Sequence, residues 1–224
     1  MNENKKRQSF LEKVPLSPKQ SLGEEIANSI THGTGVGLSI AALVILVVFA
    51  ARLGDAWKVV GFSIYGAMLI IMFLSSTLYH AFQQPMVKRF FRILDHSCIC
   101  LLIAGTYTPI TIGVMRGGWG WTLFGLIWGL TLLVINLQIF AMHKLKWMST
   151  VLYIIMGCLI VIAVRPLMAK APAGLMTWML LGGACYLLGV IFYAWKKLPW
   201  HHPIWHLFVL GGAVCHFFGM LRLV

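Results

Sequence analysis

Residues Ile26–Ala51, IANSITHGTGVGLSIAALVILVVFAA, form a long apolar run without a single Asp, Glu, Lys or Arg. A helix needs about 20 predominantly apolar residues to cross the hydrocarbon core of a bilayer. Further windows of this kind follow along the chain. They are Val59–Val87 (with its apolar part ending near Tyr79), Ile93–Met115 (interrupted only by Asp95), Gly117–His143, Trp147–Val164, Ala171–Trp195 and Leu198–Leu221. The sequence therefore predicts seven membrane-spanning segments.

The composition of the whole chain agrees with an integral membrane protein. Of its 224 residues 59% are hydrophobic and only 11% are charged, whereas a soluble domain has about 25% charged residues. The apolar runs are continuous and lack the alternation of a membrane β-barrel. The predicted fold class is therefore all-α, with seven transmembrane helices. Residues 1–21 are expected to form a polar basic segment, and residues 22–224 a single membrane domain.

Lys and Arg residues indicate the orientation in the membrane. Twelve of them lie in the N-terminal segment and in the loops on the same side of the membrane, and six lie on the opposite side. Cytoplasmic loops carry the excess of Lys and Arg, so we expect a cytoplasmic N-terminus and a C-terminus outside. The net charge of +12 is explained by these helix flanks, and no nucleic-acid partner is expected. The five cysteines all fall inside apolar runs and are interpreted as packing residues.

This topology brings distant polar residues to one depth at the cytoplasmic side. His80 ends the second span, Asp95 lies early in the third, and His202 and His206 begin the seventh. Ser76 precedes His80 by four residues, which is about one helical turn. Ionisable residues inside a membrane are rare and commonly functional. The predicted cluster is therefore a candidate site.

The spacing within the cluster favours a metal ion. His202 and His206 are four residues apart, the spacing with which one helix face offers two imidazoles to a metal. With His80 they supply three nitrogens, and three protein ligands plus an open position characterise a catalytic zinc site. Asp95 could then hydrogen-bond the zinc-bound water or act as a base, and the Ser76 hydroxyl could hydrogen-bond the oxyanion or the water. Pro203 is compatible with this arrangement if it lies in the first helical turn.

Each residue also has a simpler interpretation. A single histidine at a helix end is commonly an interfacial residue, and Ser76 could serve helix packing. Asp95 could pair with Arg89 or Arg92 at the cytoplasmic interface. Only the coincidence of all these residues at one depth favours a functional site over these alternatives.

Several long motifs resemble the bacterial hemolysin III branch of the progestin and adipoQ receptor superfamily. They are EEIANSITHG (Glu24–Gly33), SSTLYH (Ser75–His80), LDHS (Leu94–Ser97), IAGTYTP (Ile103–Pro109) and HHPIWHLFVLGGAVCHF (His201–Phe217). The resemblance implies seven helices, a cytoplasmic N-terminus, a location in the bacterial plasma membrane and a zinc ion near the cytoplasmic face. It also implies that His80, His202 and His206 are the ligands and that Asp95 holds the water. The roles of four further histidines outside this pattern stay open: His32, His96, His201 and His216.

The resemblance and the predicted cluster together lead to three functional hypotheses. The first is a zinc-dependent hydrolase of a lipid amide or ester with ceramidase-like chemistry, acting in membrane lipid homeostasis. Its partners would be membrane lipids, including the lipid substrate and a fatty-acid product. The second is a pore-forming cytolysin, as the name of the branch implies, although no span has the regular polar stripe of a water-filled pore. Asn136 and Gln138 are polar residues within the fourth span. The third is a receptor-like zinc protein without turnover. The oligomeric state is left open.

Overall fold

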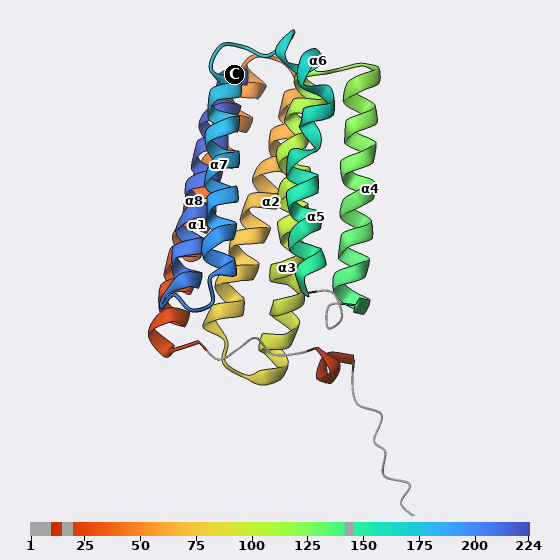
Figure 1. The fold of residues 1–224 in the computed structure, drawn as a ribbon. Helices are drawn as coiled ribbons and strands as arrows, with labels where there is room; N and C mark the ends of the chain where they lie inside the picture. The colour runs from red at the N-terminus through yellow and green to blue at the C-terminus, as the bar shows by residue number, and fades with distance from the viewer. Residues whose placement is uncertain (1–9, 15–19, 142–145) are drawn as a thin grey trace, which may run out of the picture.

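A computed structural model describes residues 10–14, 20–141 and 146–224 of the chain. These residues form an up-and-down bundle of helices (Figure 1), and no strand occurs among them. The helices are η1 (Phe10–Lys13), α1 (Leu22–Arg52), α2 (Ala56–Ala81), α3 (Pro85–Thr108), η2 (Pro109–Val114), α4 (Gly118–Ala141), α5 (Lys146–Cys158), η3 (Leu159–Ala163), α6 (Val164–Met168), α7 (Leu175–Ala194), α8 (His201–Met220) and η4 (Leu221–Leu223). Seven helical spans in this part of the chain are long and apolar enough to cross a membrane, which confirms the predicted fold class.

Capping residues and prolines set the helix ends. The Ser21 hydroxyl accepts a hydrogen bond from the backbone N–H of Glu24, whose carboxylate accepts one from the backbone N–H of Ser21. This reciprocal capping box starts α1 at Leu22, before the predicted Ile26. α2 ends at Ala81, and Pro85 opens α3. The predicted second span to Val87 was therefore too long, because a proline that starts a helix carries no charge to mark the boundary.

Besides α8, which ends in the 3₁₀ turn η4, two of the spans change helix type along their length. α3 continues into the π-helix η2 at Pro109, and α5 continues through the 3₁₀ segment η3 into α6. Where α5 changes into η3, the Tyr107 hydroxyl oxygen lies 2.9 Å from the Met156 carbonyl and 3.0 Å from the Gly157 carbonyl. The same oxygen accepts a hydrogen bond from the Ile160 N–H at 2.8 Å. Lipid offers no hydrogen-bond partners, so a side chain must pair with the backbone N–H and C=O groups that an interrupted helix leaves without partners.

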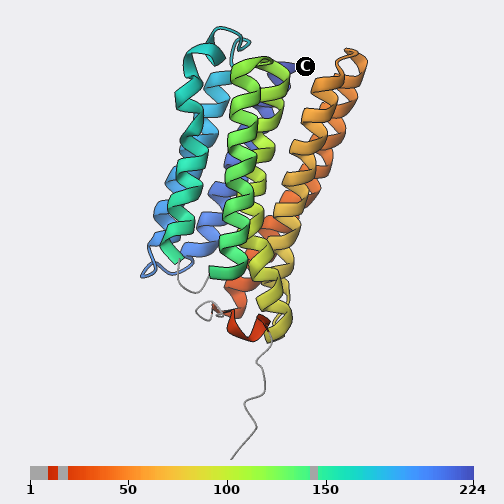
Figure 2. The same cartoon turned by 90° about the vertical axis from the view of Figure 1, so that its right-hand side faces the viewer.

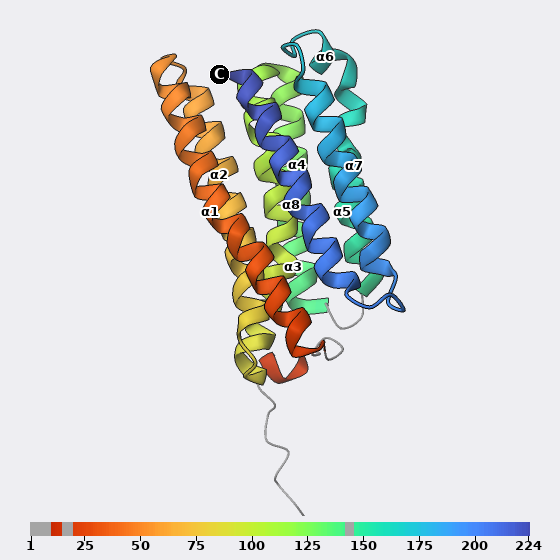
Figure 3. The ribbon, with the colours of Figure 1, turned by 90° about the vertical axis from the view of Figure 1, so that its left-hand side faces the viewer.

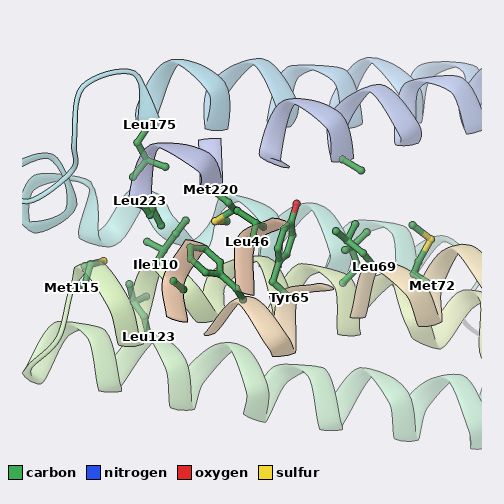
Figure 4. Close-up of a cluster of buried hydrophobic side chains, with 14 of the residues drawn as sticks. Leu46, Tyr65, Leu69, Met72, Ile110, Met115, Leu123, Leu175, Met220 and Leu223 are labelled. Carbon is green, nitrogen blue, oxygen red and sulfur yellow. The ribbon is translucent and has the colours of Figure 1, made fainter. Parts of the chain in front are cut away.

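The helices pack through a continuous apolar core. α1 and α2 run side by side and are tilted relative to the other long helices (Figures 2 and 3). Leu46 and Tyr65 from this pair join a cluster with Leu175 and Met220 from α7 and α8 (Figure 4). Small residues allow close approach, as where Gly61 of α2 faces the backbone of Pro109.

The start of α1 and the C-terminus lie at opposite ends of the bundle (Figure 1), as an odd number of spans requires. The assignment of the α1 end to the cytoplasm stays a prediction from the Lys and Arg bias. Several of the residues that carry this bias lie outside the described residues: Lys5, Lys6, Arg7, Lys19 and Lys144. The division at residues 21 and 22 likewise stays a prediction.

Candidate metal centre

Three histidines from two helices meet at the end of the bundle where α1 begins. His80 lies in the last turn of α2, and His202 and His206 lie in the first two turns of α8. One potential ligand atom from each of the three imidazoles lies within 4.8 Å of the other two. His80 and His206 are buried, and His202 is half-buried. The structure thus brings the three predicted ligands together, in an arrangement that could hold a metal ion.

The start of α8 determines where two of these side chains lie. Trp200 adopts a left-handed backbone conformation with φ of 59°, and its carbonyl accepts the first helical hydrogen bond from the N–H of Ile204. Pro203 therefore falls within the first turn, as expected, where a missing N–H breaks no helical bond. The backbone N–H of Trp200 donates to the carboxylate of Glu24 at 3.2 Å. The first turn of α1 thereby contacts the beginning of α8.

His80 is held by a carboxylate that received no role in the sequence analysis. Its Nδ1 lies 2.7 Å from Oε2 of Glu25, and Oε1 of Glu25 lies 2.6 Å from Nζ of Lys88. Glu25 was missed because the first span was predicted to begin only at Ile26. The signal was nevertheless present: Ser21 and Glu24 have the spacing of a capping box, which places the helix start before Glu25.

The donor atoms fit a metal ion. Nε2 of His80, Nε2 of His202 and both ring nitrogens of His206 are buried and lack a hydrogen-bond partner among the described residues. Buried polar atoms are rarely left unpaired, because each one costs about 1–3 kcal/mol. A cation bound by one nitrogen of each ring would remove most of this cost. Imidazoles suit zinc, copper, iron and nickel, so the three rings could hold a metal ion, but they do not specify which one.

Ser76 lies on α2, the helix that also carries His80, and Asp95 lies on the neighbouring helix α3. Ser76 is one turn before His80 on α2, and its Oγ is buried without a partner among the described residues. Asp95 is buried in α3, with Oδ2 3.6 Å from Nδ1 of His96. Its carboxylate does not belong to the close group of three imidazoles. The catalytic roles of Asp95 and Ser76 stay predictions.

Comparison with known proteins gives the family of the chain. The model of the family described as Haemolysin-III related matches residues 20–217, a range that contains every residue of the candidate centre. The chain belongs to this family. A Hemolysin-3 homolog of Bacillus subtilis is 48% identical over 201 residues, which cover 90% of this chain and 94% of the relative. Hemolysin-3 of Bacillus cereus is 48% identical over 202 residues, which cover 90% and 92%.

The haemolysin-III related chain also has more distant relatives in animals. The human Monocyte to macrophage differentiation factor is 28% identical over 215 residues, which cover 91% of this chain and 86% of the relative. This similarity agrees with the resemblance to the progestin and adipoQ receptor superfamily. No solved structure matches the chain. Family and spans together identify a multi-pass cell-membrane protein.

Three of the other histidines of this haemolysin-III related protein have separate environments. His32 of α1 lies flat against the ring of His206. Nδ1 of His96 lies 3.0 Å from the Arg92 carbonyl, and Nε2 of His216 lies 3.3 Å from the Met179 carbonyl. None of these three belongs to the group of potential ligands. Backbone contacts thus account for His96 and His216, whereas His32 packs on the candidate centre itself.

A groove of about 260 Å³ lies between the first turns of α1 and the end of α2. Glu25 and His80 contribute to its wall, and most of the other lining residues are apolar. The complete lining is Leu22, Glu25, Ile26, Ser29, Ile30, His80, Ala81 and Gln83. Since Leu22, Ile26 and Ile30 are exposed, the groove adjoins an exposed apolar surface of α1.

Proposed function

We propose that this haemolysin-III related protein binds zinc and hydrolyses an amide or ester bond of a membrane lipid at the cytoplasmic side of the membrane. This proposal rests on three imidazoles that each offer a ring nitrogen within 4.8 Å of the other two. Buried nitrogens of these rings have no hydrogen-bond partner among the described residues. Such a site on three histidines leaves a coordination position open, as in catalytic zinc sites. The proposed physiological role is the control of membrane lipid composition.

Each side chain of the site has a task in this proposal. His80, His202 and His206 hold the ion, which when bound would acidify a water molecule and polarise a carbonyl group. With the ion bound, the Asp95 carboxylate would orient the attacking water and accept its proton. The Ser76 hydroxyl donates a hydrogen bond to the carbonyl oxygen as negative charge develops there.

The groove beside the site supports a lipid substrate. Its apolar wall, formed by residues such as Ile26 and Ile30, suits an acyl chain that enters from the bilayer. Glu25 and His80 in the same wall place its polar part next to the three imidazoles. A water-soluble substrate would gain nothing from an apolar wall on the lipid-facing surface. The resemblance to the receptor superfamily favours a ceramide-like amide, and the products would then be a fatty acid and an amine.

The experiment is hydrolysis of fluorescent acyl-amide and acyl-ester lipids by the purified protein in lipid nanodiscs. We expect fatty-acid release that stops with a chelator and returns with zinc. Asp95→Asn is expected to lower kcat by about 10²–10⁴-fold, and Ser76→Ala on the order of 10²-fold, with the zinc content of both variants unchanged. Turnover that persists in His202→Ala would contradict the mechanism.

A pore-forming cytolysin is the second candidate, because two relatives at 48% identity carry the name Hemolysin-3. The polar residues of α4 do not support it. The Asn136 side chain is exposed and donates to the carbonyl of Leu132, whereas Gln138 is buried and donates to the Tyr153 hydroxyl. Ion conductance across liposomes that contain the protein would favour a pore. Zinc binding without turnover would favour a receptor-like protein.

A further inference from the structure

Glu25 joins three helices through one carboxylate. It belongs to the first turn of α1, contacts His80 at the end of α2 through Oε2 and contacts Lys88 at the start of α3 through Oε1, at 2.7 and 2.6 Å. Its side chain is only 10% exposed. The neighbouring Glu24 has a different task, since it caps α1 and contacts Trp200.

The contact with Glu25 determines which nitrogen of His80 carries the proton. An ionised carboxylate only accepts hydrogen bonds, so Nδ1 of His80 must be the donor. The Nε2 atom then holds the lone pair, and it has no hydrogen-bond partner among the described residues. The side-chain amide of Asn28 is 3.4 Å from the same Nδ1 and donates to Gln20 at 2.7 Å instead. His80 is therefore in the form that binds a metal ion through Nε2.

Lys88 keeps the carboxylate of Glu25 in place. An isolated carboxylate is costly to bury, whereas one that is paired and hydrogen-bonded is not. The Lys88 ammonium supplies the opposite charge, and the N-terminal end of α1 adds a favourable field. The Glu25 carboxylate can thus stay charged beside His80.

His80 needs such support more than the other two histidines. His202 and His206 sit one turn apart on α8, so the helix backbone sets their relative positions. His80 comes from α2, and only contacts between helices can aim its ring at the other pair. Since metal-binding histidines commonly donate their second N–H to a carboxylate, Glu25 fits this supporting task.

We propose that Glu25, supported by Lys88, is the positioning residue of the metal centre: it holds His80 with Nδ1 protonated and directs Nε2 toward the ion. This inference rests on the zinc centre of the proposed function. Its test is therefore metal binding, which does not depend on knowing the substrate.

The experiment compares zinc affinity, by competition with a chromophoric chelator, in full-length wild type, Glu25→Ala, Glu25→Gln and Asp55→Asn. Asp55→Asn is the matched control, because it removes a carboxylate paired at 2.6 Å with Arg116 at the opposite end of the bundle. We expect Glu25→Ala to weaken binding by about 10–100-fold. Glu25→Gln should bind with intermediate affinity, since its amide oxygen still accepts from Nδ1 without the charge. The control should match the wild type.

Cobalt absorption spectra separate positioning from general destabilisation. At saturating Co²⁺ we expect Glu25→Ala to show a changed visible band, because His80 is no longer held, and Asp55→Asn to keep the wild-type band. If Glu25→Ala does not fold, the isosteric Glu25→Gln provides the same comparison. Wild-type protein that binds no zinc overturns the metal centre and the role of Glu25 with it. Zinc binding that the Glu25 variants leave unchanged overturns only the role of Glu25.

Discussion

The imidazole of His32 stacks on that of His206, with ring centroids 3.6 Å apart and planes within 7° of parallel. The two residues belong to the first and last spanning helices. His32 is itself held from the side by Phe73, whose ring meets it edge-on with centroids 5.0 Å apart. One of the potential ligands thus has a flat aromatic support on α1. The stack restricts rotation of the His206 ring.

We expect His32→Ala to weaken zinc binding, because the stack that orients His206 is lost. Aromatic pairs contribute about 0.5–1.5 kcal/mol, which corresponds to a loss of up to roughly tenfold in affinity. His32→Phe retains a flat ring and should bind zinc almost as tightly as the wild type. Competition titrations measure both variants. An equal loss in His32→Phe and His32→Ala would show that the ring nitrogens matter and the stacking does not.

Metal content should depend on the three grouped histidines and on no other histidine of α8. Alanine variants of His80, His202 and His206 are each expected to lose the zinc that the wild type holds at about one ion per chain. His216→Ala is the control, because His216 is half-buried on the same helix, like His202, but its Nε2 faces the Met179 carbonyl. Elemental analysis of the purified proteins gives the result. Full zinc content in any of the three variants would remove that residue from the ligand set.

The close approach of α2 to Pro109 should make Gly61 sensitive to a single methyl group. A Cβ at Gly61 would lie 2.8 Å from Cα of Pro109, and the backbone there cannot move aside easily. We expect Gly61→Ala to lower the free energy of unfolding by about 1–3 kcal/mol. At Gly129 of α4 a Cβ would meet no atom within 4 Å, so Gly129→Ala should be neutral or stabilising. Thermal unfolding in detergent measures the difference, and equal midpoints would contradict the predicted clash.

The Tyr107 hydroxyl should matter more for stability than that of another buried tyrosine. Its contacts with the Met156 and Gly157 carbonyls and the Ile160 N–H satisfy the backbone where α5 changes into η3. Tyr107→Phe leaves these groups unpaired, and we expect a loss of about 1–3 kcal/mol. Tyr65→Phe removes a hydroxyl without a partner among the described residues and should be neutral. Similar unfolding midpoints for the two variants would argue against a structural role for this hydroxyl.

The seven spans could be predicted because charged residues are excluded from the membrane interior, so charge-free windows mark the helices. Helix ends were less accurate, since Pro85 and the Ser21 capping box act through backbone hydrogen bonds rather than through charge. The change to a π-helix at Pro109 was also missed. Nothing in an apolar run shows whether a proline will end a helix or only distort it.

The meeting of His80 with His202 and His206 could be predicted from the number of spans and the four-residue spacing alone. The contacts that support these three histidines could not be predicted from the sequence. Glu25 and Lys88 are 63 positions apart, and no spacing rule connects residues of different helices. The stack of His32 on His206 likewise depends on how closely α1 and α8 approach. Side-chain pairs between helices require the three-dimensional packing.

The position of two of the three grouped histidines on α8 has a consequence for biosynthesis. Chains emerge from the N-terminus first, so a ribosome that has reached Ala194 has made all the helices from α1 to α7 but only one of the three grouped histidines. His32 and Glu25 are already present in α1 at that point, before α8 has been synthesised. The proposed centre can therefore form only after the first turns of α8 have been made, and a chain that contains only α1 to α7 cannot hold the ion with all three histidines.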